Sequence, residues 1–313
     1  SRGRGIYPPS RPRERRDMDP IILGIAAVNG ILLGGLYGGV ALGLSLIFGV
    51  MRVINFAHGT FLMFGLFIPY WLWQLFGINP YFSALVAAPV LFGLGYSIQA
   101  TVIAPLFKRE RAMVLEPLSV LLLTAGVGLI LDNLTLMAFG PNVRGVQMEF
   151  ASTSLWIGET LAINVPRLIA FLGSVAITVA LSLFLARTDL GRSIRSTAQN
   201  RDAAALCGIN VPQIYNITFG LGCAVLGIVG CVMVPFYYVS PSVGLSFGVK
   251  SFITVVLGGI GSIPGSILGG LILGLVESIA AQFVTATSAA IFSFFIFILV
   301  LFFRPTGLMG MKV

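Results

Sequence analysis

The chain has 313 residues, of which 57% are apolar and only 10% are charged, and its mean hydropathy is +0.98. Soluble domains carry roughly a quarter charged residues, so the composition excludes a soluble protein and predicts an all-α polytopic membrane protein. The net charge of +8 does not indicate nucleic-acid binding, because the basic residues lie in loops that flank apolar segments. The cysteines, Cys207, Cys223 and Cys231, form no CxxC motif and indicate neither a zinc site nor a disulfide framework.

The sequence begins with a basic arm and continues as one transmembrane domain. Residues 1–17 carry six arginines and no apolar pattern, which predicts disorder. Met18 has the look of a natural start, so the alternative is that the arm is not native. Residues 18–313 hold about eight hydrophobic segments, and the first is too long for one straight span. They cover approximately 20–50, 59–75, 81–107, 117–139, a stretch ending at 187, 213–239, 249–279 and 289–303. We expect residues 140–167 and 240–247 on the outer face.

Basic residues set the expected sidedness. The arm, the loop around Lys108, Arg109 and Arg111, the 187–201 loop and the tail after Arg304 are all expected on the cytoplasmic side. Three segments lie between the first two of these sites, and three between the last two. Three full crossings cannot begin and end on one side. Either one element in each half is re-entrant, therefore, or a long segment consists of two elements.

Each half contains an interrupted apolar stretch, INFAHG at residues 54–59 and GGIGSIPG at residues 258–265. Broken segments in two loosely related halves indicate a transport pathway. Irregular backbone at membrane depth survives only where protein or a water-filled cavity surrounds it. We therefore predict a pathway lined by Asn55, His58, Gly258, Gly259, Gly261, Pro264 and Gly265.

The same residues also have purely structural interpretations. Asn55 could be the N-cap of the next helix while His58 satisfies freed carbonyl groups, and the glycines could serve a tight break alone. Among the few intramembrane charges, Asp132 and the neighbouring Asn133 are expected at the outer interface. Lys250 is interpreted as a snorkelling anchor, and Glu277 as an interfacial or packing residue.

Residues 187–211 form a polar segment with four arginines, between two apolar stretches. Asp189 is the expected N-cap, residues 200–207 read as a short helix, and Gly208 is expected to end it. Asn210 and Pro212 then start the next membrane helix. Such a helix could pass force from a soluble partner to the membrane. The alternative is a solvated loop that only sets topology.

Several motifs of catalysis are missing from the chain. It contains no GxxxxGK[ST], HExxH or GxSxG motif, and His58 is its only histidine. We therefore expect neither an enzyme nor a bound cofactor, and any nucleotide must bind to another chain.

Three stretches resemble one known family. They are GLSLIFGVMRVINFAHGTFLMFG (residues 43–65), LGRSIRSTAQNRDAAALCGIN (190–210) and VVLGGIGSIPGSILGGLILGLVES (255–278). Together they resemble the LivH-type permease of branched-chain amino acid ABC importers, in one order from about residue 20 onward. The basic arm departs from this pattern.

The resemblance implies a permease of the bacterial inner membrane that works in an assembly. Its implied partners are a second, LivM-like permease, two cytoplasmic ATPases that bind ATP and Mg²⁺, and a periplasmic solute-binding protein. It implies that residues 200–208 form the coupling helix that docks into the ATPase. The implied coupling residues are Gly191, Arg195, Asn200, Asp202, Ala203, Leu206 and Gly208.

The resemblance favours a branched-chain or hydrophobic amino acid as the solute. Related importers carry urea, short amides or other small acids, so these remain alternatives. A stand-alone secondary transporter or channel is the rival from another class, although the intramembrane acids it would need are few.

Overall fold

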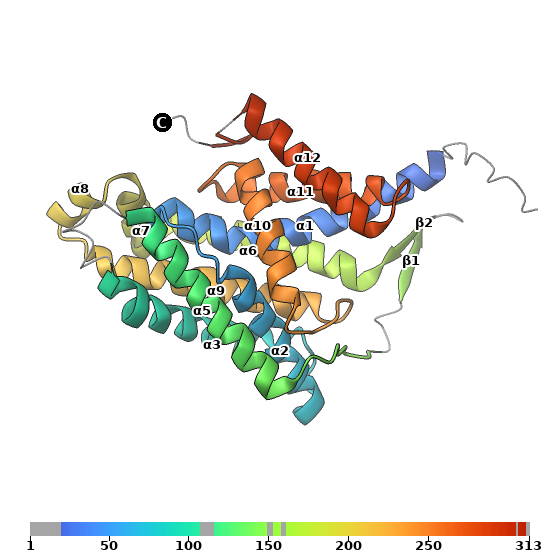
Figure 1. The fold of residues 1–313 in the computed structure, drawn as a ribbon, viewed down its shortest axis with the longest axis horizontal. Helices are drawn as coiled ribbons and strands as arrows, with labels where there is room; N and C mark the ends of the chain where they lie inside the picture. Colours follow the sequence, from blue (N-terminus) through green and yellow to red (C-terminus); the bar gives the residue numbers. More distant parts are fainter. Residues whose placement is uncertain (1–19, 107–115, 149–152, 158–160, 305, 311–313) are drawn as a thin grey trace, which may run out of the picture.

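The computed structural model describes residues 20–106, 116–148, 153–157, 161–304 and 306–310, and its fold is helical, as predicted (Figure 1). The arm of residues 1–17 and the Lys108–Arg111 loop lie outside the described residues. The helices are α1 (Pro20–Met51), α2 (His58–Phe76), α3 (Ala84–Ile98) with a π-helical continuation (Gln99–Ile103), α5 (Glu116–Phe139), α6 (Val165–Arg187), α7 (Asp189–Gln199), α8 (Arg201–Leu206), α9 (Val211–Met233), α10 (Val243–Gly258), α11 (Ile263–Ala280) and α12 (Ala286–Phe303).

Seven of the described helices are long and apolar enough to cross a membrane, and α10 and the 288–303 part of α12 are shorter apolar helices. The two strands, β1 (Ser154–Ile157) and β2 (Leu161–Asn164), form an antiparallel hairpin in which Ser154 pairs with Asn164. The hairpin lies within residues 140–167, the predicted outer loop.

Helix α1 is the centre of the bundle and packs closely against α11. The two are antiparallel, and glycines line their contact: a Cβ added at Gly34 would lie 2.6 Å from the Leu271 Cα, and one at Gly274 would lie 2.4 Å from the Gly34 Cα. Small residues allow this close backbone approach. The first apolar segment, which we expected to be too long for one straight span, is a single uninterrupted helix of 32 residues. Its length of roughly 48 Å exceeds the hydrocarbon core of a bilayer.

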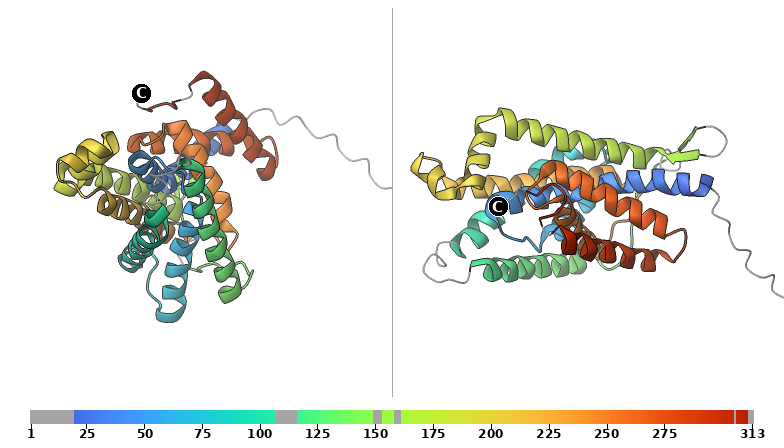
Figure 2. Two further views of the ribbon diagram at one scale, coloured as in Figure 1. Left: turned by 60° about the vertical axis from the view of Figure 1, so that its left-hand side comes forward. Right: turned by 90° about the horizontal axis from the view of Figure 1, so that it is seen from above.

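The two ends of the bundle differ in their elements. Figures 1 and 2 show α7 and α8 at one end and the β1–β2 hairpin at the other, with α1 running between them. The end with α7 and α8 carries Arg187, Arg192, Arg195 and Arg201, which indicates the cytoplasmic face. At the other end, Arg144 lies over the rings of Tyr70 and Trp71. Aromatic side chains of this kind gather at membrane interfaces.

These positions explain how three apolar segments can lie between each pair of expected cytoplasmic sites. Helix α1 starts beside β2, and its last residue, Met51, lines a cavity with Thr197 of α7, so the described chain begins at the outer end of the bundle. The arm of residues 1–17, which we expected on the cytoplasmic side, lies outside the described residues. In the second half, the predicted seventh segment is two helices, α10 and α11, as one of our two alternatives required. Helix α10 begins at Val243, so part of the expected outer turn at 240–247 is helical.

Helix α2 begins inside the bundle. The ring of His58, its first residue, lies 2.9 Å from the Val40 carbonyl of α1. Val40 is 11 residues before Met51, so this point is roughly 16 Å from the cytoplasmic end of α1. Residues 52–57 therefore carry the chain back into the bundle without forming a helix. The first predicted break thus lies at membrane depth.

Candidate functional site

The first break is held by hydrogen bonds from side chains. The Ala57 amide donates to Asn55 Oδ1 at 3.0 Å, and the Phe56 amide donates to Thr124 Oγ1 of α5 at 3.2 Å. Arg52 adopts a left-handed conformation with a φ of 57°. The residue that precedes α2 is Ala57, which has no capping side chain, so Asn55 is not the N-cap. It holds a turn one step earlier, and Thr124 satisfies backbone groups that the bilayer could not.

His58 is buried against α1. Its Nε2 is 2.9 Å from the Val40 carbonyl oxygen, so this nitrogen is the donor, and its Nδ1 has no partner among the described residues. A Cβ on Gly43 would lie 3.2 Å from the ring. This geometry agrees with the structural interpretation of His58, in which the ring satisfies a carbonyl group. The side chain is 1% exposed.

A cavity of about 330 Å³ opens beside the break. Loop 54–56, the start of α2, and parts of α1, α5 and α10 form its walls. Three polar residues line it: Asn55, Thr60 and Asp132. Asp132 therefore faces the bundle and not only the outer interface, where the sequence placed it. The rest of the wall is apolar or glycine: Leu44, Ile54, Phe56, Gly59, Ala125, Gly128, Leu129, Gly244, Leu245, Gly248, Val249 and Phe252.

The second break lies at the cytoplasmic end of the bundle. Gly259 and Gly261 have positive φ values of 105° and 79°, and a Cβ on Gly261 would lie 2.9 Å from the Gly49 Cα near the end of α1. A Cβ on Gly258 would lie 2.0 Å from the Gly265 carbonyl oxygen. Pro264 is in the first turn of α11, which Ser262 caps through the Gly265 amide at 3.1 Å. The two breaks are therefore at different depths.

Helix α10 connects the two breaks. At its start, Gly244 touches Gly59 of α2 so closely that a Cβ on Gly59 would lie 1.9 Å from the Gly244 carbonyl oxygen. At its end, residues 260–264 line a cavity together with Ile194 and Arg195 of α7. One helix thus runs from the cytoplasmic segment to the cavity beside Asn55. Sequence spacing does not reveal this link.

A cluster of charged and polar side chains joins α1, α10 and α11. Lys250 Nζ lies 2.7 Å from Glu277 Oε1 and 2.6 Å from the Tyr37 hydroxyl, and that hydroxyl donates to Glu277 Oε2 at 2.9 Å. The side chains of Lys250 and Glu277 are 26% and 16% exposed. Lys250 is therefore an ion-pair partner, and its interpretation as a snorkelling anchor was wrong. Opposite charges near the two ends of one long, interrupted apolar stretch, residues 249–279, are the signal that could have indicated the pair.

The cytoplasmic segment consists of two helices, where one was expected. Thr188, and not Asp189, is the N-cap of α7, because its hydroxyl accepts from the Gly191 amide at 3.0 Å. Asn200 caps α8 by accepting from the amides of Asp202 and Ala203, both at 3.0 Å. Gly208, with a φ of 84°, ends it as predicted.

The α7–α8 segment has a buried side and an exposed side. A Cβ on Gly191 would lie 2.5 Å from the carbonyl oxygens of Phe184 and Leu185, and Arg195 donates to the Leu185 carbonyl at the end of α6. These two residues hold α7 against α6. In α8 only Ala204 is buried, whereas Asp202 and Ala203 are exposed and Leu206 is 90% exposed. The seven predicted coupling residues thus include four that build the segment and three that face outward.

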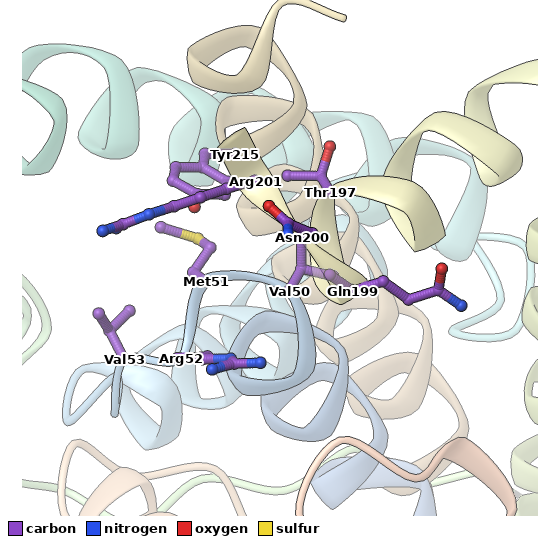
Figure 3. A pocket seen from close by; sticks show the side chains of 10 residues that line it. Val50, Met51, Arg52, Val53, Thr197, Gln199, Asn200, Arg201 and Tyr215 are labelled. Atoms are coloured by element: carbon purple, nitrogen blue, oxygen red, sulfur yellow. The ribbon is translucent and has the colours of Figure 1, made fainter. Parts of the chain in front are cut away.

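A cavity of about 470 Å³ lies beneath the junction of α7 and α8 (Figure 3). Met51 of α1 points toward Tyr215 of α9 and Arg201 of α8, while Gln199 points away. The end of α1 therefore lies directly under the start of α8. Among the described residues, no cluster of three or more His, Cys, Asp and Glu side chains could hold a metal ion.

A bundle of membrane-spanning helices, with an open cavity between α2, α5 and α10 and an exposed helix at one end, is the arrangement of a polytopic membrane transport protein. The chain belongs to the family described as the branched-chain amino acid transport system / permease component, whose model matches residues 26–303. The predicted resemblance is confirmed.

Curated relatives cover most of the chain. It is 31% identical over 297 residues to the high-affinity branched-chain amino acid transport system permease protein LivH of Salmonella typhimurium, covering 90% of this chain and 94% of the relative. It is 32% identical over 297 residues to BraD of Pseudomonas aeruginosa, with the same coverage. It is also 29% identical over 203 residues to the ribose import permease protein RbsC of Escherichia coli, covering 63% and 61% of the two chains. No solved structure matches.

Proposed function

We propose that this chain is the permease subunit of an ABC importer that moves branched-chain or other hydrophobic amino acids into the cell. Two partner ATPases would bind ATP and Mg²⁺ and push on α8, a second, LivM-like permease would complete the transmembrane pathway, and a periplasmic protein would deliver the solute. The names of LivH and BraD support the solute class. The main structural support is α8 itself, a capped helix that projects Leu206 from the cytoplasmic end.

The geometry favours a lever over a passive loop. Helix α8 packs against α7, α7 packs against α1, and α7 lines a cavity with the second break at residues 260–264. A force on α8 would therefore reach both α1 and α10. Helix α10 in turn touches the start of α2, and residues of α2 and α10 line the cavity beside Asn55. ATP-driven closure of the ATPases would rock these helices and change the side to which that cavity opens.

The test is substitution of the exposed face of α8. We expect Leu206→Arg to abolish uptake and the stimulation of ATP hydrolysis in the assembled importer, while the protein still inserts in the membrane, because Leu206 makes no buried contact here. Leu155→Arg is the matched control, since Leu155 is an exposed leucine on the β1 strand at the outer end. Normal uptake by Leu206→Arg would refute the coupling role, and flux through the purified chain without partners would favour a stand-alone transporter.

A further inference from the structure

The cavity beside the first break contains hydrogen-bonding groups without partners. Asn55 is 2% exposed, and its Nδ2 has no partner among the described residues. Asp132 Oδ1 is equally without a partner, while the Asp132 carboxylate accepts a hydrogen bond from the Thr60 hydroxyl. Unsatisfied buried polar groups are costly and are rare in folded proteins. Here a donor and an acceptor without partners line the same small space.

The start of α2 adds two more donors. The amides of Gly59 and Thr60 are in the first turn of the helix, and in the described part of the chain neither has an acceptor. Both residues line the cavity. Free amides at a helix N-terminus, together with the helix dipole, favour an anionic group. Asn55 is four residues before Gly59 and lines the same cavity, so its side-chain Nδ2 is a further donor that a carboxylate could use.

The rest of the cavity suits an aliphatic side chain. Its wall contains Leu44, Leu129, Leu245, Val249 and Phe252, and its volume of about 330 Å³ is at the lower end of the range for small-molecule sites, roughly 300–1,000 Å³. Asp132 also lines a second hollow with Asn133, Pro141 and Ser242 at the outer end. A solute arriving from outside would thus meet Asp132 before it reaches the deeper cavity.

We propose that this cavity is an amino-acid binding site within the permease, with Asp132 holding the ammonium group and the Gly59 and Thr60 amides with Asn55 Nδ2 holding the carboxylate. The aliphatic side chain packs on α10 and α5. The inference rests on the proposed function and adds the residues that recognise the solute. The acceptor and the donors lie close together, because the Thr60 hydroxyl bonds Asp132, and this suits the ammonium and carboxylate groups that an amino acid carries on one carbon.

The test is binding of L-leucine to the purified importer, with its partner permease and ATPases but without the solute-binding protein. We expect Asp132→Asn to weaken leucine binding about tenfold or more, since a charge-assisted hydrogen bond is lost. The probe 4-methylpentanoate, which lacks the ammonium group, should bind weakly to the wild type and no more weakly to Asp132→Asn, because this variant removes a repulsion and no attraction. Thr101→Ala is the control, because Thr101 bonds its own helix backbone and lines neither hollow.

A second variant tests the width of the site where α10 meets the start of α2, because a Cβ on Gly248 would face the Gly59 Cα and amide nitrogen. A Cβ on Gly248 would lie no closer than 3.5 Å to any neighbouring atom, so Gly248→Ala should fold normally while narrowing the cavity. We expect it to shift the preference from leucine toward valine by several fold. A change confined to stability would not alter this ratio.

The outcomes separate the two proposals. If the wild-type importer takes up leucine but Asp132→Asn and Gly248→Ala leave leucine affinity and the leucine-to-valine ratio unchanged, the site is refuted and the proposed function stands. If the complete importer carries no amino acid, both proposals fail. A lipid chain as the natural occupant would show no response to Asp132→Asn, and that result too would overturn the site.

Discussion

Two charged side chains that are 27 residues apart in sequence, Lys250 and Glu277, meet inside the helix bundle. Both also bond Tyr37, so a single polar cluster connects α1, α10 and α11. Taking charges out of water is expensive, and their attraction repays this cost only when the geometry is good and further hydrogen bonds are made. The Tyr37 hydroxyl provides that additional bonding.

The cluster yields a stability prediction. Lys250→Met should lower the free energy of unfolding, because Glu277 would keep a charge without a partner. The loss for a fully buried pair is about 3–5 kcal/mol, and we expect a smaller value here since both side chains are partly exposed. The double variant Lys250→Met/Glu277→Met should recover part of this loss. Thermal unfolding in detergent measures both, and simple additivity of the two single effects would contradict the coupling.

Glycine and asparagine residues at the breaks were identified from the sequence, yet their roles depend on the surroundings. Gly59 permits contact with Gly244, and Asn55 holds a turn instead of capping a helix. Asp132 was expected at the interface but lines the cavity with Thr60. Local spacing indicates that a residue is special, whereas the neighbours that decide its role come from α5 and α10.

Helix α8 depends on its N-cap, Asn200, more than on buried contacts. It is six residues long, and only Ala204 is buried. Short helices are marginal in water without tertiary support. The Asn200 side chain, which accepts two amide hydrogen bonds, is thus a main stabilising group for the helix that we propose docks with the ATPase.

Replacing this cap should loosen α8. We expect Asn200→Ala to destabilise the helix by about 1 kcal/mol, the usual cost of a lost N-cap, and to speed hydrogen exchange at the Asp202 and Ala203 amides. Coupling of ATP hydrolysis to uptake should fall with it. Asn200→Asp keeps the acceptor oxygen and should behave as the wild type. Unchanged exchange in Asn200→Ala would show that other contacts hold the helix.

The fold places the α7–α8 end of the bundle and the β1–β2 end on opposite sides of a membrane. Helix α1 crosses once, and its Met51 end lies under α8. The described chain therefore starts on the side of the β1–β2 hairpin, because a continuous 32-residue helix cannot turn back within the bilayer.

The native cysteines test this orientation. Cys207 is exposed on the cytoplasmic segment, whereas Cys223 and Cys231 are buried in α9. A membrane-impermeant thiol reagent should label Cys207 in inside-out vesicles. It should leave the protein unlabelled in intact cells whose outer membrane has been permeabilised. Trp156→Cys in a Cys207→Ser background is the control, since Trp156 is exposed on β1 and should give the reverse pattern. Labelling of Cys207 from outside would contradict the assignment.

The class of protein, the positions of both breaks, both ends of α8 and the start of α9 followed from the amino-acid sequence. These features depend on apolar length, glycine, proline and capping residues, which act over a few neighbouring positions. Only the tertiary structure decided the single crossing of α1, the division of the seventh segment, the Lys250–Glu277 pair and the cavity at Asp132. Each of these joins residues that are distant in the chain, and in a bilayer such contacts follow from the close packing of glycine-lined helices, which no local pattern encodes.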